Sequence, residues 1–568
     1  MFKKNTKHLQ TDIFGLFNSL PSKMQDKIKQ SEEYYFYKLI FSKIDEKIFS
    51  ILYSDKKSRP NSAVNAMVAS LILMNRRQWT YEELFKQIQF NILVRIALGL
   101  DSIDEMPFSP ATIFNFQNRI NDHFVHSGEN LLEQVFDNLT TGQIKALKIK
   151  TNIQRTDSFA VASNIRNYSR LQLLVELILR IWRILSDEHK ELFSSHFETY
   201  IGKTSGQFIY SLSSSDFPKE LEKTGQLYHW IDKNLKPFYA GHDIFRTFER
   251  VYNEHFSIVD HKITVKSNDE LSSSSLQSPD DLDAAYRLKN NEATKGQSIN
   301  VTETAHPDNP INLVNDVDVN PVNKDDSVVL NKRIDKIKDK TPDLDELHFD
   351  GAYGSAENDK KFEEHNITPV QTAVRGSKSA VDIEIEKESD GQYTVSCPAQ
   401  TVGSIKTRKR YKAEFNLQIC NHCPLRDKCP AIIMKKYRVY YFTQKEYLTK
   451  RRQKFIKAIP PERRHLRNNV EATVNEFTCR LHKKKLKVRG LFKTSVFAYS
   501  AAMSVNFGRI YRLIVTDPVK YARFLYFSIK IFKDRLQNVV DNLRFYKNKI
   551  IFNFHNKLLC FRTPLFSV

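Results

Sequence analysis

Two aspartates that lie far apart in the chain each close a short β-like run, and this pairing constrains the fold more than any other feature. Asp157 ends the run 148–157, and Asp350 ends the run 344–350. Carboxylates at the ends of neighbouring strands can hold a hard cation such as Mg²⁺, which prefers oxygen ligands. Aspartates in such places also serve as turn formers or caps. If they are functional, we expect both strands in one sheet.

The pattern between the two aspartates predicts a mixed α/β core. A strand is followed by a long, mostly helical stretch, by two short strands with a turn at His306–Pro310, and by a helix and a further strand. These segments are expected at 149–159, 168–262, 296–304, 311–319, 325–338 and 344–349. The two short strands should pair as a hairpin, and the helical stretch should be an insertion.

The N-terminal part, residues 1–145, predicts helices. Thr80-Tyr-Glu-Glu83 has the form of a capping box, and Ser109-Pro110 is typical of an N-cap followed by proline at the first helical position. Several short helices with turns between them suit a helix-turn-helix-like module. A plain helical bundle fits the same pattern.

The charge of the chain favours a polyanionic partner. The 568 residues suggest two to four domains, and the formal net charge is +21 with a pI near 9.4. A surface this basic binds nucleic acid by releasing counterions. A basic protein without such a partner is the alternative. The sequence predicts neither a secretory signal nor a membrane span.

A third carboxylate, Glu471, lies in the most basic part of the chain. Pro460-Pro461 predicts the start of a helix that carries Arg467 and Glu471 four positions apart. These two could form a surface ion pair. Between positions 450 and 493, however, 15 lysines and arginines stand against three acids. We therefore expect this helix to lie along phosphates, with Glu471 as a metal ligand.

Four cysteines form a candidate zinc site. Cys420-x2-Cys423-x5-Cys429 has the tight spacing that brings thiolates together, and Cys397 lies upstream. Four thiolates at about 2.3 Å would make a closed structural Zn²⁺ site. Reduced, partly buried thiols are the alternative.

Over residues 58–512, the motifs in their order resemble the Asp-Asp-Glu (DDE) transposases encoded by bacterial insertion sequences. Similar segments carry the family's first aspartate, second aspartate, glutamate and closing helix. Here they read Thr156-Asp-Ser-Phe, Asp350-Gly-Ala-Tyr-Gly-Ser, Arg467-Asn-Asn-Val-Glu471 and Gly490 through Asn506. Two positions depart from the family pattern: Arg464 stands where many relatives have tyrosine, and Thr478 where they have lysine.

The resemblance implies a ribonuclease-H-like mixed-sheet catalytic core with a helical insertion, plus an N-terminal all-helical domain. It implies Asp157, Asp350 and Glu471 as ligands of Mg²⁺ or Mn²⁺. The expected activity is cleavage at the element ends, followed by strand transfer to target DNA. DNA contacts are expected from the basic residues around the glutamate, namely Arg464, Arg467, Lys483, Lys484 and Lys485.

The expected organisation has three parts. A helical N-terminal domain at 1–145 is expected to bind DNA. The expected catalytic domain spans 146–512, with its helical insertion at about 168–262 and a cysteine-bearing insertion at about 390–440. A basic aromatic tail spans 513–568. The expected partners are double-stranded DNA, as terminal inverted repeats and target, and a second copy of the chain in the DNA complex. No membrane partner is expected.

The expected location is the cytoplasm of a prokaryote, at the nucleoid. Two other functions stay open on the sequence. One is a metal-dependent nuclease without strand transfer. The other is a transposase-derived DNA-binding protein that has lost catalysis.

Overall fold

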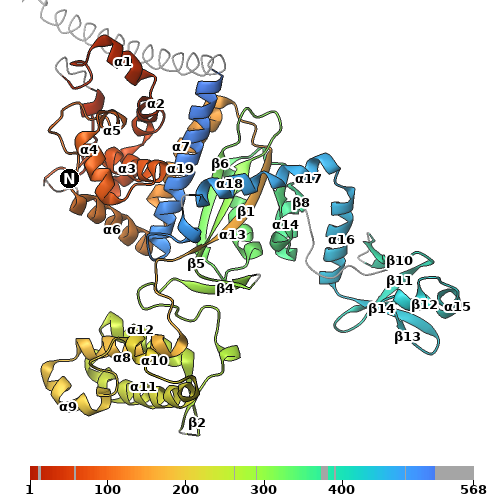
Figure 1. The fold of residues 1–568 in the computed structure, drawn as a ribbon. Helices are drawn as coiled ribbons and strands as arrows, with labels where there is room; N and C mark the ends of the chain where they lie inside the picture. Colours follow the sequence, from red (N-terminus) through yellow and green to blue (C-terminus); the bar gives the residue numbers. More distant parts are fainter. Residues whose placement is uncertain are drawn as a thin grey trace, which may run out of the picture.

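The computed structural model describes residues 1–517 except 10–14, 55, 57–58, 261, 290, 372–380, 389–391 and 480, and except the side chains of Pro461, Glu462 and Arg464. The cysteine Cys560 and residues 518–568 of the expected tail lie outside the described residues. Figure 1 shows a central sheet flanked by helices, and two modules that project from this central part.

The central sheet is mixed, as predicted. Its strands are β1 (Ile153–Ala162), β4 (Ala285–Lys289), β5 (Glu292–Thr304), β6 (Val314–Pro321), β7 (Glu346–Phe349) and β8 (Thr368–Gln371). The order is β4-β5-β1-β7-β8, with β6 also paired to β5. The predicted hairpin is confirmed as the antiparallel β5–β6 pair. Helix α13 (Asp326–Lys340) connects this hairpin to β7.

The two aspartates lie on neighbouring strands, but the expectation that both end their strands is wrong for Asp157. Strands β1 and β7 pair in parallel, and the pairing stops at Arg155↔His348. β1 continues to Ala162 because the longer β5 pairs with it as far as Gly296. Asp157 therefore lies in mid-strand, just beyond the point where β7 leaves the ladder, and this exposes its side to the segment that follows β7.

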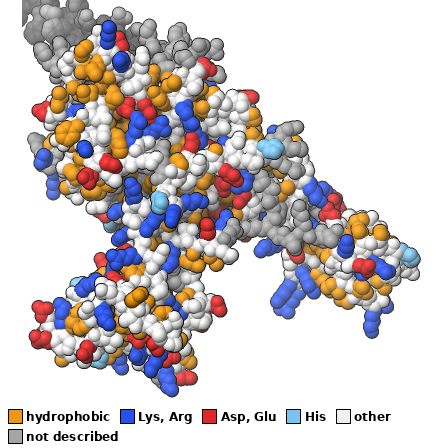
Figure 2. Space-filling view, in the orientation of Figure 1, with side chains coloured by type: hydrophobic (Ala, Val, Ile, Leu, Met, Phe, Trp, Pro, Cys, Tyr) orange, Lys and Arg blue, Asp and Glu red, His pale blue; other side chains and the backbone are white. Residues whose placement is uncertain are grey.

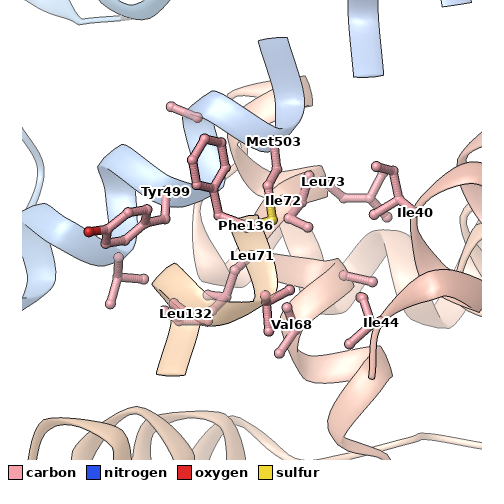
Figure 3. Close-up of a cluster of buried hydrophobic side chains, with 14 of the residues drawn as sticks. Ile40, Ile44, Val68, Leu71, Ile72, Leu73, Leu132, Phe136, Tyr499 and Met503 are labelled. Atoms are coloured by element: carbon pink, nitrogen blue, oxygen red, sulfur yellow. The ribbon is translucent and has the colours of Figure 1, made fainter. Parts of the chain in front are cut away.

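The N-terminal helices pack against the last helix of the described chain. They are α1 (Ser22–Lys29), α2 (Glu32–Leu39), α3 (Val64–Arg77), α4 (Tyr81–Phe90), α5 (Ile92–Ala97), α6 (Pro110–Ser127) and α7 (Leu131–Leu147). Both predicted helix starts are confirmed: Thr80 and Glu83 form a capping box, and Ser109 caps α6. Figure 3 shows Tyr499 and Met503 of α19 (Leu491–Thr516) among Phe136, Leu71 and Ile72. One hydrophobic core thus joins residues from both ends of the described chain.

The helical insertion is a separate layer with its own core. It contains α8 (Arg170–Ile184), α9 (Asp187–Phe197), α10 (Ser205–Tyr210), α11 (Phe217–Tyr239) and α12 (Asp243–His255), followed by the hairpin β2 (Phe256–Val259) and β3 (Lys262–Val265). Helix α8 is buried along most of its length because its apolar residues are packed inside this layer. In Figure 1 the layer projects below the sheet.

The cysteine-bearing segment forms a second sheet. Its strands are β9 (Glu384–Lys387), β10 (Tyr393–Cys397), β11 (Gln400–Lys406), β12 (Tyr411–Asn416), β13 (Ile432–Ile433) and β14 (Tyr437–Phe442), in the order β13-β14-β12-β11-β10-β9. Helix α15 (Leu417–Asn421) lies within it, and α16 (Gln444–Ala458) leads back to the central sheet. Figure 1 shows this module at the far end of α16.

The predicted basic helix is divided in two. Helix α17 (Pro461–Asn468) begins at the expected proline, and α18 (Val470–Thr478) follows after Asn469. Lys483 and Lys484 belong to a short 3-10 turn and have positive φ angles of 49° and 54°. Helix α18 therefore ends before these two lysines. Within the described residues, no helix is long and apolar enough to span a bilayer.

Candidate active site

Arg467 lies between the two sequence-predicted aspartates. Its Nη2 atom is 3.0 Å from Asp157 Oδ2 and 3.9 Å from Asp350 Oδ2. The side chains of Arg467 and Asp157 are only 18% and 14% exposed, so this ion pair is largely shielded from water. The structure therefore brings Asp157, Asp350 and Arg467 together from β1, the end of β7 and α17.

Each aspartate uses one oxygen to hold itself in place. Asp157 Oδ1 accepts a hydrogen bond of 2.9 Å from the Ser158 amide, and Asp350 Oδ1 accepts one of 2.8 Å from the Ala352 amide. The second carboxylate oxygen of each residue is the one directed at the guanidinium. Two oxygens, one from β1 and one from the residue after β7, thus lie near one cation, which is the arrangement that a divalent ion between them also needs.

Burial dominates the electrostatics of Asp157. Desolvation raises the pKa of its carboxyl, and the negative charges of Asp350 and Asp326 raise it further. The Arg467 guanidinium and the Ser158 amide lower the pKa and so oppose that shift. The site therefore favours a positive charge beside Asp157.

Asp326, which sequence reasoning missed, is a third acid beside this pair. It is 4% exposed at the start of α13, and its Oδ1 accepts a hydrogen bond of 2.7 Å from Ser158 Oγ. Arg287 Nη2 lies 3.6 Å from Asp326 Oδ2. The sequence predicts the helix start but not the contact of Asp326 with Ser158, because an aspartate beside an N-cap is well explained by the helix dipole alone.

The structure does not bring Glu471 to the aspartates. Its side chain is exposed in the first turn of α18 and has no hydrogen-bond or ion-pair partner among the described residues. The buried face of α18 is formed by Val470, Thr473 and Phe477. Glu471 lies off this stripe, since successive helical residues are turned by about 100°. The surface ion pair considered from the sequence is not formed, because Arg467 faces Asp157 instead.

A buried ionic network that sequence reasoning also missed fixes the position of these helices. Glu303 on β5 is fully buried and accepts hydrogen bonds from Arg155 Nε (2.7 Å), Thr473 Oγ1 (2.8 Å) and Arg509 Nη1 (2.6 Å). Arg155 Nη1 also donates to the Leu466 carbonyl at 2.7 Å. The carbonyl belongs to the residue before Arg467, so this network determines where the guanidinium lies.

Gly354 is needed for space and not for a turn. A Cβ atom at this position would lie 2.8 Å from Gln371 Oε1, whereas the φ angle of −70° is open to any residue. Gln371 belongs to β8, the strand next to β7. The glycine therefore lets the segment after Asp350 pass close to the sheet.

The predicted DNA-contacting lysines lie near the end of β1. Lys483, Lys484 and Lys485 are exposed, and Lys485 Nζ donates to the Ile165 carbonyl at 3.3 Å. Lys485 also forms an isolated parallel bridge with Ala162. The side chain of Arg464 lies outside the described residues. Figure 2 shows further lysine and arginine side chains on both projecting modules, with acids interspersed.

The four cysteines line one small cavity. Cys397, Cys420, Cys423 and Cys429 surround about 20 Å³ at one end of the second sheet. Burial raises the pKa of the Cys420 thiol, and the other three thiols raise it further. The donor set suits zinc. As the structure stands, however, no group of three or more His, Cys, Asp or Glu residues within the described part is arranged to hold a metal ion.

Antiparallel β6, β5 and β1 followed by parallel β7 and β8, with acids on β1 and after β7, define a ribonuclease-H-like fold. Residues 393–511 match the family model described as Transposase DDE domain, and residues 23–119 match Transposase domain (DUF772). The chain belongs to the DDE-type transposases of insertion sequences. No curated protein matches it. As a transposase, the protein acts on DNA, and its class generally uses divalent metal ions.

Proposed function

We propose that this transposase cuts DNA at the ends of its own mobile element and joins the freed ends to target DNA, with Asp157, Asp350 and Glu471 as the catalytic acids. The observation that carries the proposal is the shared position of Asp157 and Asp350 around one guanidinium, 3.0 Å and 3.9 Å from its Nη2 atom. Residues far apart in sequence reach this arrangement only through the pairing of β1 with β7.

The chemistry has two steps. Water attacks the phosphorus at the element end, the bond from phosphorus to the 3′ oxygen breaks, and the element keeps a 3′ hydroxyl. That 3′ oxygen then attacks a phosphorus of target DNA and displaces the target's 3′ oxygen. Divalent ions, when bound by the carboxylates, would activate the attacking oxygen and stabilise the leaving one.

The chain's own residues supply position and charge. Asp157 and Asp350 are each held by a backbone amide, so each directs its other oxygen at the Arg467 guanidinium. Arg467 lies beside both carboxylates and is a phosphate ligand by its chemistry. Glu471 lies one helical turn further on, and α17 and α18 meet at Asn469. For Glu471 to reach the aspartates, α18 would have to turn at this junction and release the contact of Thr473 with Glu303.

Strand cleavage and strand transfer can be tested separately with purified protein. Duplexes carrying the inverted repeats that flank the gene should be cut in Mg²⁺ or Mn²⁺, and a pre-cut end should join to plasmid DNA. Asp157→Asn and Glu471→Gln should abolish both reactions and keep DNA binding, whereas the matched control Glu476→Gln should not abolish chemistry. Full cleavage by Asp157→Asn protein would refute the assignment.

The same assay separates the alternative functions. Cutting without joining would identify a nuclease, and DNA binding without any metal-dependent cutting would identify a protein that has lost catalysis. The second outcome would agree with the exposed position of Glu471. It would be supported if the protein neither cut an intact end nor joined a pre-cut end. We also propose that two copies act together, since two element ends must be joined. Light scattering of the DNA complex measures this directly.

We propose, in addition, that the four cysteines bind Zn²⁺ as a structural ion. Three of them lie on loops or short helices around the cavity, and Cys397 ends strand β10. The thiols would close on the ion by small movements of these loops. The ion would then tie β10 to α15, far from the aspartates, and would take no part in the reaction.

A further inference from the structure

An open groove separates the N-terminal helices from the segment that follows α18. Its volume is about 620 Å³, within the range of ligand sites. The walls come from the end of α3, the start of α4, residues 481–488 and the first half of α19. Both matched transposase segments therefore contribute to it.

The lining combines aromatic rings with positive charge. Trp79, Tyr81 and Phe497 lie among the lining residues, together with Lys485, Lys487 and Lys493. No aspartate or glutamate is among the described residues that line the groove. Both Lys487 and Lys493 are exposed, and neither forms an ion pair within 4.0 Å among the described residues, although the charge of Lys487 acts on the nearby Glu83 carboxylate.

A buried hydroxyl group points to a ligand independently. Ser500 of α19 lines the groove and is 1% exposed, and its Oγ atom has no hydrogen-bond partner among the described residues. Buried polar atoms are nearly always paired, and an unpaired one costs stability. A ligand with a hydrogen-bonding edge would pair with this atom.

The groove lies close to the reaction site along β1. Leu486 N donates to the Ala162 carbonyl at 2.9 Å, so the groove wall continues from the end of β1. Asp157 is five residues back on the same strand, which is about 16 Å at roughly 3.3 Å per residue. At a rise of about 3.4 Å per nucleotide, this corresponds to about five nucleotide steps.

We propose that this groove binds one nucleotide unstacked from a DNA strand near the cleavage point. The base would stack on the aromatic residues and hydrogen-bond to Ser500 Oγ, and its phosphates would contact Lys487 and Lys493. Stacking on aromatic side chains and basic contacts to phosphates are the usual features of single-strand binding. The inference rests on the proposed function only in taking DNA as the bound strand.

Trp79 provides a reporter for the test. The chain has three tryptophans, and the other two, Trp182 and Trp230, lie in the helical insertion. A full-length Trp182→Phe/Trp230→Phe protein therefore emits from Trp79 alone. Asp157→Asn is added so that no DNA is cut and binding is measured apart from catalysis.

A single-stranded oligonucleotide, or a duplex with unpaired terminal bases, should quench this emission, and a blunt duplex should quench it less. Ser500→Ala should weaken binding about 3- to 10-fold, the usual worth of one hydrogen bond, without lowering the melting temperature. Ser70→Ala is the matched control, because Ser70 Oγ is also buried and unpaired but does not line the groove. For Lys493→Ala, the slope of the logarithm of the DNA-binding constant against the logarithm of the salt concentration should fall by about one.

Three results would overturn the proposal. One is DNA binding by anisotropy without any change in Trp79 emission. Another is equal weakening by Ser500→Ala and Ser70→Ala. The third is a free deoxynucleoside monophosphate that binds as tightly as the oligonucleotide, which would make the groove a site for free nucleotides. Lack of DNA cleavage by the wild-type protein would refute the proposed function but leave these binding results valid.

Discussion

Arg467 on α17 donates a hydrogen bond of 3.0 Å to Asp157 on β1, although 310 positions separate them in the sequence. The same Nη2 atom lies 3.9 Å from Asp350 Oδ2. A guanidinium thus occupies the gap between two carboxylates that are proposed to hold metal. Removal of the Arg467 side chain should therefore show how strongly the two carboxylates favour a cation between them.

In metal-free buffer at pH 7, we expect Arg467→Ala to lower the free energy of unfolding by about 1–3 kcal/mol, because Asp157 and Asp350 lose the charge they share. Mn²⁺ should raise the melting temperature of this variant more than that of the wild type. Differential scanning calorimetry with and without Mn²⁺ measures both effects. Arg463→Ala, on the same helix but paired with Glu346, is the control and should respond like the wild type. An equal response to Mn²⁺ in all three proteins would contradict the prediction.

The Glu303 network should be the largest single ionic contribution to the catalytic core. Glu303→Gln leaves Arg155 and Arg509 buried without their shared negative charge, so we expect a loss of ~3–5 kcal/mol in urea unfolding. DNA cleavage should fall as well, because Arg155 also donates to the carbonyl of Leu466, the residue before Arg467. The exposed Glu384→Gln should change stability by less than about 0.5 kcal/mol. If Glu303→Gln unfolds at the same urea concentration as the wild type, the network does not hold α17.

His255 should make the helical insertion sensitive to mild acid. Burial, together with Arg170 and Lys266, lowers the pKa of this side chain to about 3, and Arg170 Nε donates to its Nδ1 atom. Below the unfolded-state pKa near 6.5, the unfolded chain binds a proton that the folded chain does not. The stability contributed by neutral His255 is therefore full above pH 6.5 and is lost as the pH falls from 6.5 toward 3.

At pH 5 this loss should reach about 2 kcal/mol, at about 1.4 kcal/mol per pH unit. Melting curves between pH 7.5 and 5 measure it as the difference between the wild type and His255→Gln, in which the slope should be smaller. The exposed His422→Gln serves as the control and should keep the wild-type slope. Identical slopes for wild type and His255→Gln would show that this histidine does not titrate between the two states.

Zinc should accompany the protein when it is purified without chelator, at about one equivalent per chain. Cys420→Ser should lose the metal and destabilise the second sheet, because Cys420 is buried in that module's core. Cys479→Ser, at an exposed position outside the module, should keep it. Less than about half an equivalent of zinc in the wild type would count against the site.

Local patterns were enough to predict much of the fold. The capping box at Thr80–Glu83, the N-cap at Ser109 and the β5–β6 hairpin follow from short-range hydrogen bonding and turn chemistry, which the residues carry with them. The order of motifs also predicted the transposase family, which two matching segments confirm. What the sequence by itself determined was therefore the elements, their order and the family.

Only the tertiary structure decided which charges meet. Arg467 could pair with Glu471 one turn away, yet it contacts Asp157, because the Glu303 network positions α17 over β1. Asp326 and Glu303 gave no recognisable signal in the sequence, since each acquires its role from residues on other strands or helices. Long-range partners depend on strand register and helix packing. These are properties of the whole core that local spacing does not encode.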